Sequence, residues 1–239
     1  MITHFRYMTN KKLVKVYSHP RSGTHFLEAF LAQNFYKAKD LSIDKITWGH
    51  WSNKKIKEDG NPYGQLFGHH FFPTQNNFKK PGIYIIRDGR AVAYSIWKTQ
   101  NFLHKDIDGK IPFSDFLRTP LDWSGSPSKK TDNGDTIFEH WAKHCDEWLK
   151  FSKANKRLLI VYYEDLVNKP YESYLNIKKH FFWYKLKLNS KKINQIKEPT
   201  GLLPNNANID SWKNIFTDSD IKLFLECLEN PVLNTKYGN

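Results

Sequence analysis

The sequence has few cysteines and no long apolar segment, and each shortage excludes a class of protein. Cys145 and Cys227 are its only cysteines, too few and too isolated for a disulfide framework or a cysteine-ligated zinc site. No apolar run approaches the roughly 18 residues that a membrane-spanning helix needs. Residues 1–12 are polar and lack the apolar core of a secretory signal. We therefore expect a soluble, cytoplasmic protein that requires no metal and has no membrane partner.

Negative charge is also in short supply. The chain has 37 Lys+Arg against 24 Asp+Glu, a formal net charge of +13, and residues 150–197 alone carry +9. Aromatic residues make up 15% of the chain, which excludes an intrinsically disordered polymer. The charge by itself indicates an anionic partner: nucleic acid, an acidic membrane surface or a phosphorylated small molecule. One hypothesis is therefore a non-catalytic protein that binds polyanions or nucleic acid.

Arginine is scarce and unevenly placed. Only six of the basic residues are arginines, and three of these, Arg21, Arg87 and Arg90, fall in two short motifs. The planar guanidinium group suits bidentate contacts to phosphate, which the point charge of lysine cannot imitate. The two motifs are therefore candidates for phosphate binding.

Strands and helices are expected to alternate along the chain. Short apolar runs predict strands at residues 13–18, 65–72, 82–87 and 157–163. Helical spacing and capping signals predict helices at residues 24–36, 89–99, 135–154, 170–183 and 218–229. The pattern predicts one α/β domain over residues 1–239, with a mostly parallel, P-loop-like central sheet flanked by helices. Residues 101–135 show little periodicity, and we expect an irregular insertion there.

The first motif joins a strand to a helix and reads SHPRSGT over residues 18–24. Backbone N–H groups at the helix N-terminus, with the hydroxyls of Ser22 and Thr24, make a cradle for an anion. Arg21 lies in the middle of this cradle. Gly23 matches the last glycine of the P-loop pattern GxxxxGK[ST], but the Lys and Ser/Thr that follow it there are missing. A P-loop kinase is therefore disfavoured.

With His25 included, this motif resembles the 5′-phosphosulfate loop of the sulfotransferases, of cytosolic or bacterial type, that use 3′-phosphoadenosine 5′-phosphosulfate (PAPS). Arg21 stands in the place of the usual lysine, and His25 stands where threonine is commoner. The resemblance implies that PAPS and its product, adenosine 3′,5′-bisphosphate (PAP), bind at Arg21, Ser22, Gly23, Thr24 and His25.

Three further segments match the same family in the same order. Residues 83–95, IYIIRDGRAVAYS, are similar to its 3′-phosphate segment. There Arg87 at a strand end and Ser95 two turns into a helix can converge on one phosphate. Residues 161–166, VYYEDL, resemble a strand end that implies a place for Tyr163 near the adenine and 3′-phosphate. Residues 211–217, SWKNIFT, are similar to a segment near the family's C-terminus.

The chain also departs from the family pattern. The Arg-Lys-Gly that usually grips the 3′-phosphate aligns with Asn205, Asn206 and Ala207, so the two asparagines are candidate replacements, as are lysines of the basic region. The family's usual dimerisation sequence is not recognisable, which leaves the oligomeric state open.

The resemblance implies a histidine as general base, after a strand and upstream of the 3′-phosphate segment. His69 and His70 follow one another there, and neighbours on a strand point to opposite faces, so one of them is expected to enter the site. We prefer His69, which overlays the family's Lys-Thr-His best. His70 and a carboxylate of residues 101–135 are the alternatives.

The expected reaction is in-line sulfuryl transfer from PAPS to a hydroxyl or amine. In that reaction Arg21 would stabilise charge on the leaving phosphate. The expected partner is a small-molecule or glycan acceptor rather than a specific nucleic acid. Aromatic residues that can line the acceptor pocket are Trp48, His50, Trp51, Trp97 and Trp123.

Overall fold

Four parallel strands form one sheet in the order β2-β1-β3-β4. The strands are β1 (Lys15–Ser18), β2 (Phe67–His69), β3 (Gly82–Ile86) and β4 (Leu158–Tyr162). The computed structural model describes residues 13–36, 66–76, 78, 80–100, 102–107, 110–123, 134–182 and 209–238. Because β3 is apolar throughout and fully buried, it occupies an interior position of the sheet, as a parallel strand covered on both faces should.

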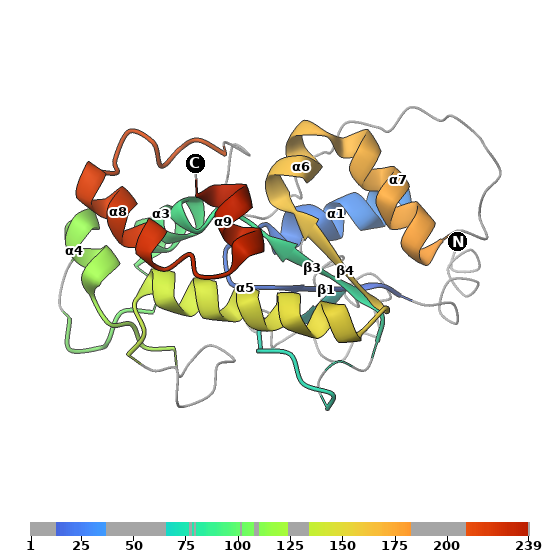
Figure 1. Cartoon of the computed structure of the whole chain (residues 1–239), viewed down its shortest axis with the longest axis horizontal. Coiled ribbons are helices and arrows are strands. Elements are labelled where there is room, and N and C mark those ends of the chain that lie inside the picture. Colours follow the sequence, from blue (N-terminus) through green and yellow to red (C-terminus); the bar gives the residue numbers. More distant parts are fainter. Residues whose placement is uncertain are drawn as a thin grey trace, which may run out of the picture.

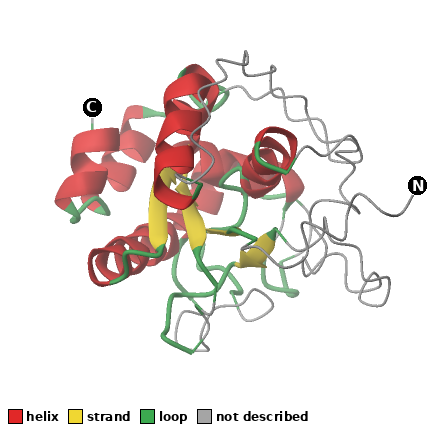
Figure 2. Ribbon diagram, turned by 90° about the vertical axis from the view of Figure 1, so that its right-hand side faces the viewer, coloured by secondary structure: helices red, strands yellow, loops and turns green. Residues whose placement is uncertain are grey.

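Helices cover both faces of this sheet (Figures 1 and 2). They are α1 (Thr24–Asn34), α3 (Gly89–Thr99), α4 (Phe113–Arg118), α5 (Ile137–Ala154), α6 (Tyr163–Asn168), α7 (Pro170–Phe181), α8 (Asp218–Glu226) and α9 (Pro231–Tyr237). Alternate strand residues enter two cores: Tyr84 packs with α3 and α5, whereas Ile83 and Ile85 pack with α1 and α7. The predicted single α/β domain with a parallel sheet is therefore confirmed.

Three short helices were not expected. The segment 101–135 was predicted to be irregular, but it contains α4, whose buried side chains Phe113, Phe116 and Leu117 join the core beside α5. Helices α6 and α9 contain only six and seven residues, too short to show a helical period. Isolated helices of that length are unstable in water, so both depend on tertiary contacts.

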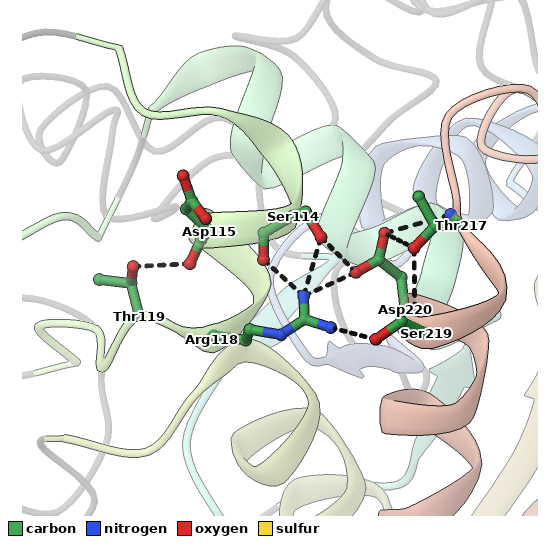
Figure 3. Close-up of polar contacts among 7 residues, drawn as sticks. All are labelled: Ser114, Asp115, Arg118, Thr119, Thr217, Ser219 and Asp220. Atoms are coloured by element: carbon green, nitrogen blue, oxygen red, sulfur yellow. Dashed lines mark hydrogen bonds and ion pairs between the residues drawn. The ribbon is translucent and has the colours of Figure 1, made fainter.

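Helix α4 is tied to the start of α8 by a buried carboxylate (Figure 3). Asp220 accepts hydrogen bonds from Ser114 Oγ at 2.5 Å, from Arg118 Nη1 at 2.6 Å and from Thr217 Oγ1 at 2.8 Å. Burial by itself would raise the pKa of Asp220, but these donors hold the pKa below its ordinary value. The carboxylate therefore fixes the 110–123 part of the insertion against the C-terminal helices.

The shared strand direction decides where a site can form. The chain leaves β1, β3 and β4 at the same edge of the sheet, where Ser18, Arg87 and Tyr163 follow or end the strands. Ligands of open parallel sheets bind at this carboxyl edge, and the residues of both arginine motifs meet there.

Candidate functional site

The turn between β1 and α1 has an unusual backbone. Arg21 and Gly23 both have positive φ, 66° and 88°, and left-handed residues in such a turn direct successive N–H groups inward. A Cβ atom at Gly23 would lie 2.3 Å from Cδ2 of Tyr163, so only glycine fits there. Helix α1 begins at Thr24 without a side-chain cap. Its first N–H groups thus have no capping side chain and can bind an anion.

Residues of the two arginine motifs converge at this turn. Arg21 Nε donates to Ser95 Oγ of α3 at 3.0 Å, and Arg87 Nη1 donates to the carbonyl oxygen of Arg21 at 3.3 Å. The Arg87 guanidinium also lies 4.7 Å from the centre of the Tyr163 ring. These contacts connect Arg21 with both Arg87 and Ser95, the pair that the spacing of the second motif predicted to converge, and they connect Arg87 with Tyr163.

No acidic side chain in the described part of the chain neutralises the two guanidinium groups. Among the residues that the structure describes, neither Arg21 nor Arg87 forms an ion pair with an aspartate or glutamate. Burial, and then the nearby Arg87, lower the pKa of Arg21. In the same place Ser22 Oγ and Arg87 Nε are buried and have no hydrogen-bond partner among the described residues. Buried charges and polar atoms are normally paired, so this arrangement fits an anion with several oxygen atoms.

His25, the remaining loop candidate, has a different partner. His25 lies in the first turn of α1, and its Nδ1 lies 3.0 Å from Glu28 Oε2 of the same helix. Arg90 forms an ion pair with Asp88 at 2.9 Å and lies over the Trp212 ring. Arg90 therefore makes contacts at the start of α3 rather than with Arg21 or Arg87.

The two candidate bases, His69 and His70, have different neighbours in the structure. His70 is buried, and its Nδ1 lies 2.7 Å from the carbonyl oxygen and 3.1 Å from Oγ of Ser18. Ser18 Oγ in turn contacts Thr24 Oγ1 at 2.7 Å. The ring of His69 packs instead against Tyr17 and Trp148. The structure therefore brings His70, the alternative from the sequence, to the turn, whereas the preferred His69 faces the aromatic core.

Several other candidates can be placed or set aside. Asn205, Asn206, Trp48, His50 and Trp51 lie outside the described residues. Trp97 is half-buried and donates to the carbonyl oxygen of Ile111 at 2.9 Å. Trp123 is fully buried and stacks on His140. Of the two aromatic candidates within the described ranges, Trp123 is therefore the one that contacts His19 of the turn and His140.

Sequence reasoning missed three buried histidines beside the turn: His19, His140 and His144. His140 and His144 stand four residues apart on α5, on the same face as the buried Trp141, Cys145 and Trp148. Two histidines at helical spacing on an apolar face were the available signal.

Two negative observations apply to the described residues. None of their helices is long and apolar enough to span a bilayer. No group of three or more His, Cys, Asp or Glu side chains within those ranges is arranged to hold a metal ion.

Comparison with known proteins identifies the family. A family model described as "Sulfotransferase domain" matches residues 12–230. The structure is similar to that of mouse sulfotransferase SULT7A1 complexed with PAP, with a TM-score of 0.57, 18% identity, and coverage of 94% of this chain and 86% of that one. It is also similar to retinol dehydratase in complex with androsterone and inactive cofactor PAP, with a TM-score of 0.56, 16% identity, and coverage of 90% and 79%.

A search among curated protein sequences finds no match. The family match supports sulfuryl transfer and does not favour a non-catalytic polyanion-binding protein. The resemblance predicted from four sequence motifs is thereby confirmed. Because the match extends over nearly the whole sequence, this chain belongs to the sulfotransferase domain family.

Proposed function

We propose that this enzyme transfers a sulfuryl group from PAPS to a hydroxyl or amine of a small-molecule or glycan acceptor and releases PAP. The observation that carries the proposal is the Arg21–Arg87 cluster beside the N-terminus of α1, which forms no ion pair with any described aspartate or glutamate. Both solved structures described above contain PAP, a nucleotide with two phosphates. The orphaned Ser22 Oγ and Arg87 Nε supply further contacts for phosphate oxygens, so the residues present fit such a nucleotide.

Two phosphates require two groups of donors. Residues 21–24 and the first N–H groups of α1 would hold the 5′ side, where the sulfuryl group is carried. Arg87 directly follows β3, and Ser95 lies two turns into α3, the helix that comes next. These two side chains would hold the 3′-phosphate. Tyr163 packs against both Gly23 and Arg87 and so would position the two halves relative to each other.

His70 is the base that the geometry supports. The carbonyl oxygen of Ser18 can only accept a hydrogen bond, so Nδ1 of His70 carries the proton at the 2.7 Å contact. Nε2 then has the lone pair that a general base needs. His70 would take the proton of the acceptor hydroxyl as its oxygen attacks sulfur.

Arg21 would act on the other side of the sulfur atom. When the old sulfur–oxygen bond breaks, negative charge collects on the bridging oxygen of the departing phosphate, and a fixed guanidinium stabilises that charge. Arginine does not readily give up a proton, so its help is electrostatic. PAPS, when bound, supplies the activated sulfuryl group.

A thermal-shift experiment tests the nucleotide assignment. A ligand at about 100 times its dissociation constant stabilises a fold by about 2.7 kcal/mol, so PAP should raise the melting temperature more than AMP or ATP does. Arg21→Ala should weaken PAP binding about 10–100-fold, the cost of losing charge-assisted hydrogen bonds. Arg157→Ala is the matched control, because Arg157 is exposed at the opposite end of the sheet. An equal rise in melting temperature with PAP, AMP and ATP would refute the proposal.

Turnover tests the base. With labelled PAPS and an acceptor panel, His70→Gln should lose sulfate transfer while PAP binding persists, and His69→Gln should keep transfer. The opposite result would assign the base to His69. PAP binding by the wild-type protein without transfer to any acceptor would favour a binding protein instead.

A further inference from the structure

A cluster of four buried histidines lies between the turn and helix α5. His19, His70, His140 and His144 are each at most 4% exposed. The ring of His19 lies 5.1 Å from that of His140 and 5.4 Å from that of His144. His144 Nε2 lies 2.9 Å from the carbonyl oxygen of His70. The cluster thus connects α5 with both the turn and the proposed base.

Carbonyl partners fix which nitrogen of each ring carries the proton, because a carbonyl oxygen only accepts. His144 donates from Nε2 to His70, and its Nδ1 accepts from the Tyr84 hydroxyl at 2.7 Å. His19 donates from Nδ1 to the carbonyl oxygen of Pro20 at 2.9 Å. Its Nε2 therefore accepts from Nδ1–H of His140 at 3.0 Å. This leaves Nε2 of His140 as the nitrogen with the unused lone pair.

That lone pair is buried and unsatisfied. No donor among the described side chains or backbone groups bonds to Nε2 of His140. Burial, followed by the neighbouring His19, lowers the pKa of His140 well below its ordinary value, so the ring stays neutral and keeps an acceptor there. A buried acceptor without a donor is costly and calls for an explanation.

The surroundings of His140 indicate where a donor would come from. Its ring stacks on Trp123 at 3.7 Å, and Trp123 stacks on Phe102 at 4.8 Å. Phe72, two residues after His70, meets the ring of His140 edge-on, with the ring centres 5.6 Å apart. Helix α5, the insertion and the segment after the base therefore meet at the ring of His140. Trp123 and Phe72 thus face the His140 ring with aromatic surface, whereas His19 and His144 contribute further ring contacts to it.

We propose that Nε2 of His140 accepts a hydrogen bond from a second donor group of the acceptor substrate, making His140 a specificity-determining residue. The substrate class is then an alcohol or phenol that carries another hydroxyl or N–H group besides the one that receives sulfate. The inference rests on the proposed sulfotransferase function. The hydrogen bond to His140 would select among acceptors, which the residues that bind the nucleotide do not contact.

The test compares acceptors that differ by one hydroxyl. Labelled PAPS is supplied with phenol or catechol, and with cyclohexanol or cyclohexane-1,2-diol, and kcat/KM is measured for each. For wild-type protein we expect the diol of each pair to be favoured about 10-fold or more, the size of one buried hydrogen bond. In His140→Phe, which can still stack on Trp123, that ratio should fall to near one. His180→Phe, an exposed position on α7, should keep the wild-type ratio.

Three results would overturn the inference: no preference in the wild type, an unchanged preference in His140→Phe, or an ordered water molecule bonded to Nε2 when a diol is bound. If His140→Phe does not fold, His140→Leu replaces it, because leucine likewise has no hydrogen-bond acceptor. If PAP binds but none of the four acceptors is sulfated, the ¹⁵N resonance of His140 Nε2 decides, because catechol must shift it and phenol must not. Absence of PAP binding would instead refute the proposed function, so the two failures are distinguishable.

Discussion

Acidification should destabilise this protein through its buried imidazoles, and His19 allows the size of the effect to be worked out. The His19 ring is completely buried, and this burial lowers its pKa from 6.5 to about 4, although the hydrogen bond to Pro20 acts in the opposite direction. In the unfolded chain the same ring is hydrated and titrates near 6.5. Between these two values the unfolded state binds a proton that the folded state does not.

Stability therefore falls as the pH falls through that window. For His19 alone, the difference in pKa corresponds to about 2 kcal/mol lost by pH 5 and about 3 kcal/mol lost by pH 4. Burial also lowers the pKa of His140 and His144 well below the ordinary value, so both act in the same direction. Since the three rings are in contact, their contributions will not add independently.

Urea denaturation at pH 7.5, 6, 5 and 4.5 measures the effect. The variant His19→Asn serves as the comparison, because an asparagine amide can still donate to Pro20 but does not titrate. Its free energy of unfolding should fall less steeply with decreasing pH than that of the wild type. Added salt should leave the slope largely in place, since salt screens surface charges but not burial. A wild-type stability that stays constant from pH 7.5 to pH 5 would refute the reasoning.

Three further predictions concern single positions. Gly23→Ala should cost several kcal/mol in urea denaturation, because a Cβ there would meet Tyr163 at a φ of 88°. Gly134→Ala, with a φ of 104° but no atom within 4 Å, should cost only about 1 kcal/mol, and equal losses would contradict the clash. Asp220→Asn should lower stability by about 1–3 kcal/mol by weakening the hydrogen bonds that tie α4 to α8, and an unchanged melting temperature would refute that role. Arg87→Lys should weaken PAP binding about 10-fold in calorimetry, since lysine keeps the charge but loses the planar fork; unaltered affinity would show that charge alone suffices.

The sheet and the long helices could be predicted because their signals are local. The apolar run at residues 82–87 and the arginine that ends it mark a buried strand and its carboxyl end. Parallel pairing then brings Arg21, Arg87 and Ser95 together. Helix α9 could not be predicted in this way, since it depends on contacts such as that of Tyr237 with Glu164 at 2.9 Å, across a long sequence separation.

The choice between two adjacent histidines shows where local reasoning ends. Alternation along a strand predicted that one of His69 and His70 would enter the site, but which one depends on the register of β2 against β1. The structure pairs Tyr17 with His69, which leaves His70 beside Ser18. The orphaned nitrogen of His140 was likewise unpredictable, because its only side-chain hydrogen-bond partner in the described structure, His19, is 121 residues away in sequence.

The order of strands in the sheet has a consequence for how the protein is made. Strand β1 leaves the ribosome before the other strands of the sheet, since β3 ends at Ile86 and β4 ends at Tyr162. At synthesis rates of about 5–20 residues per second, the first strand waits on the order of 10 s before the whole sheet can close. Non-local parallel pairing is slow, so the apolar face of α1 and the two inner strands are exposed in the nascent chain for that interval. The lysine-rich segment that follows β4 emerges just as the sheet becomes complete, and its charge should keep the partly folded chains apart at that stage.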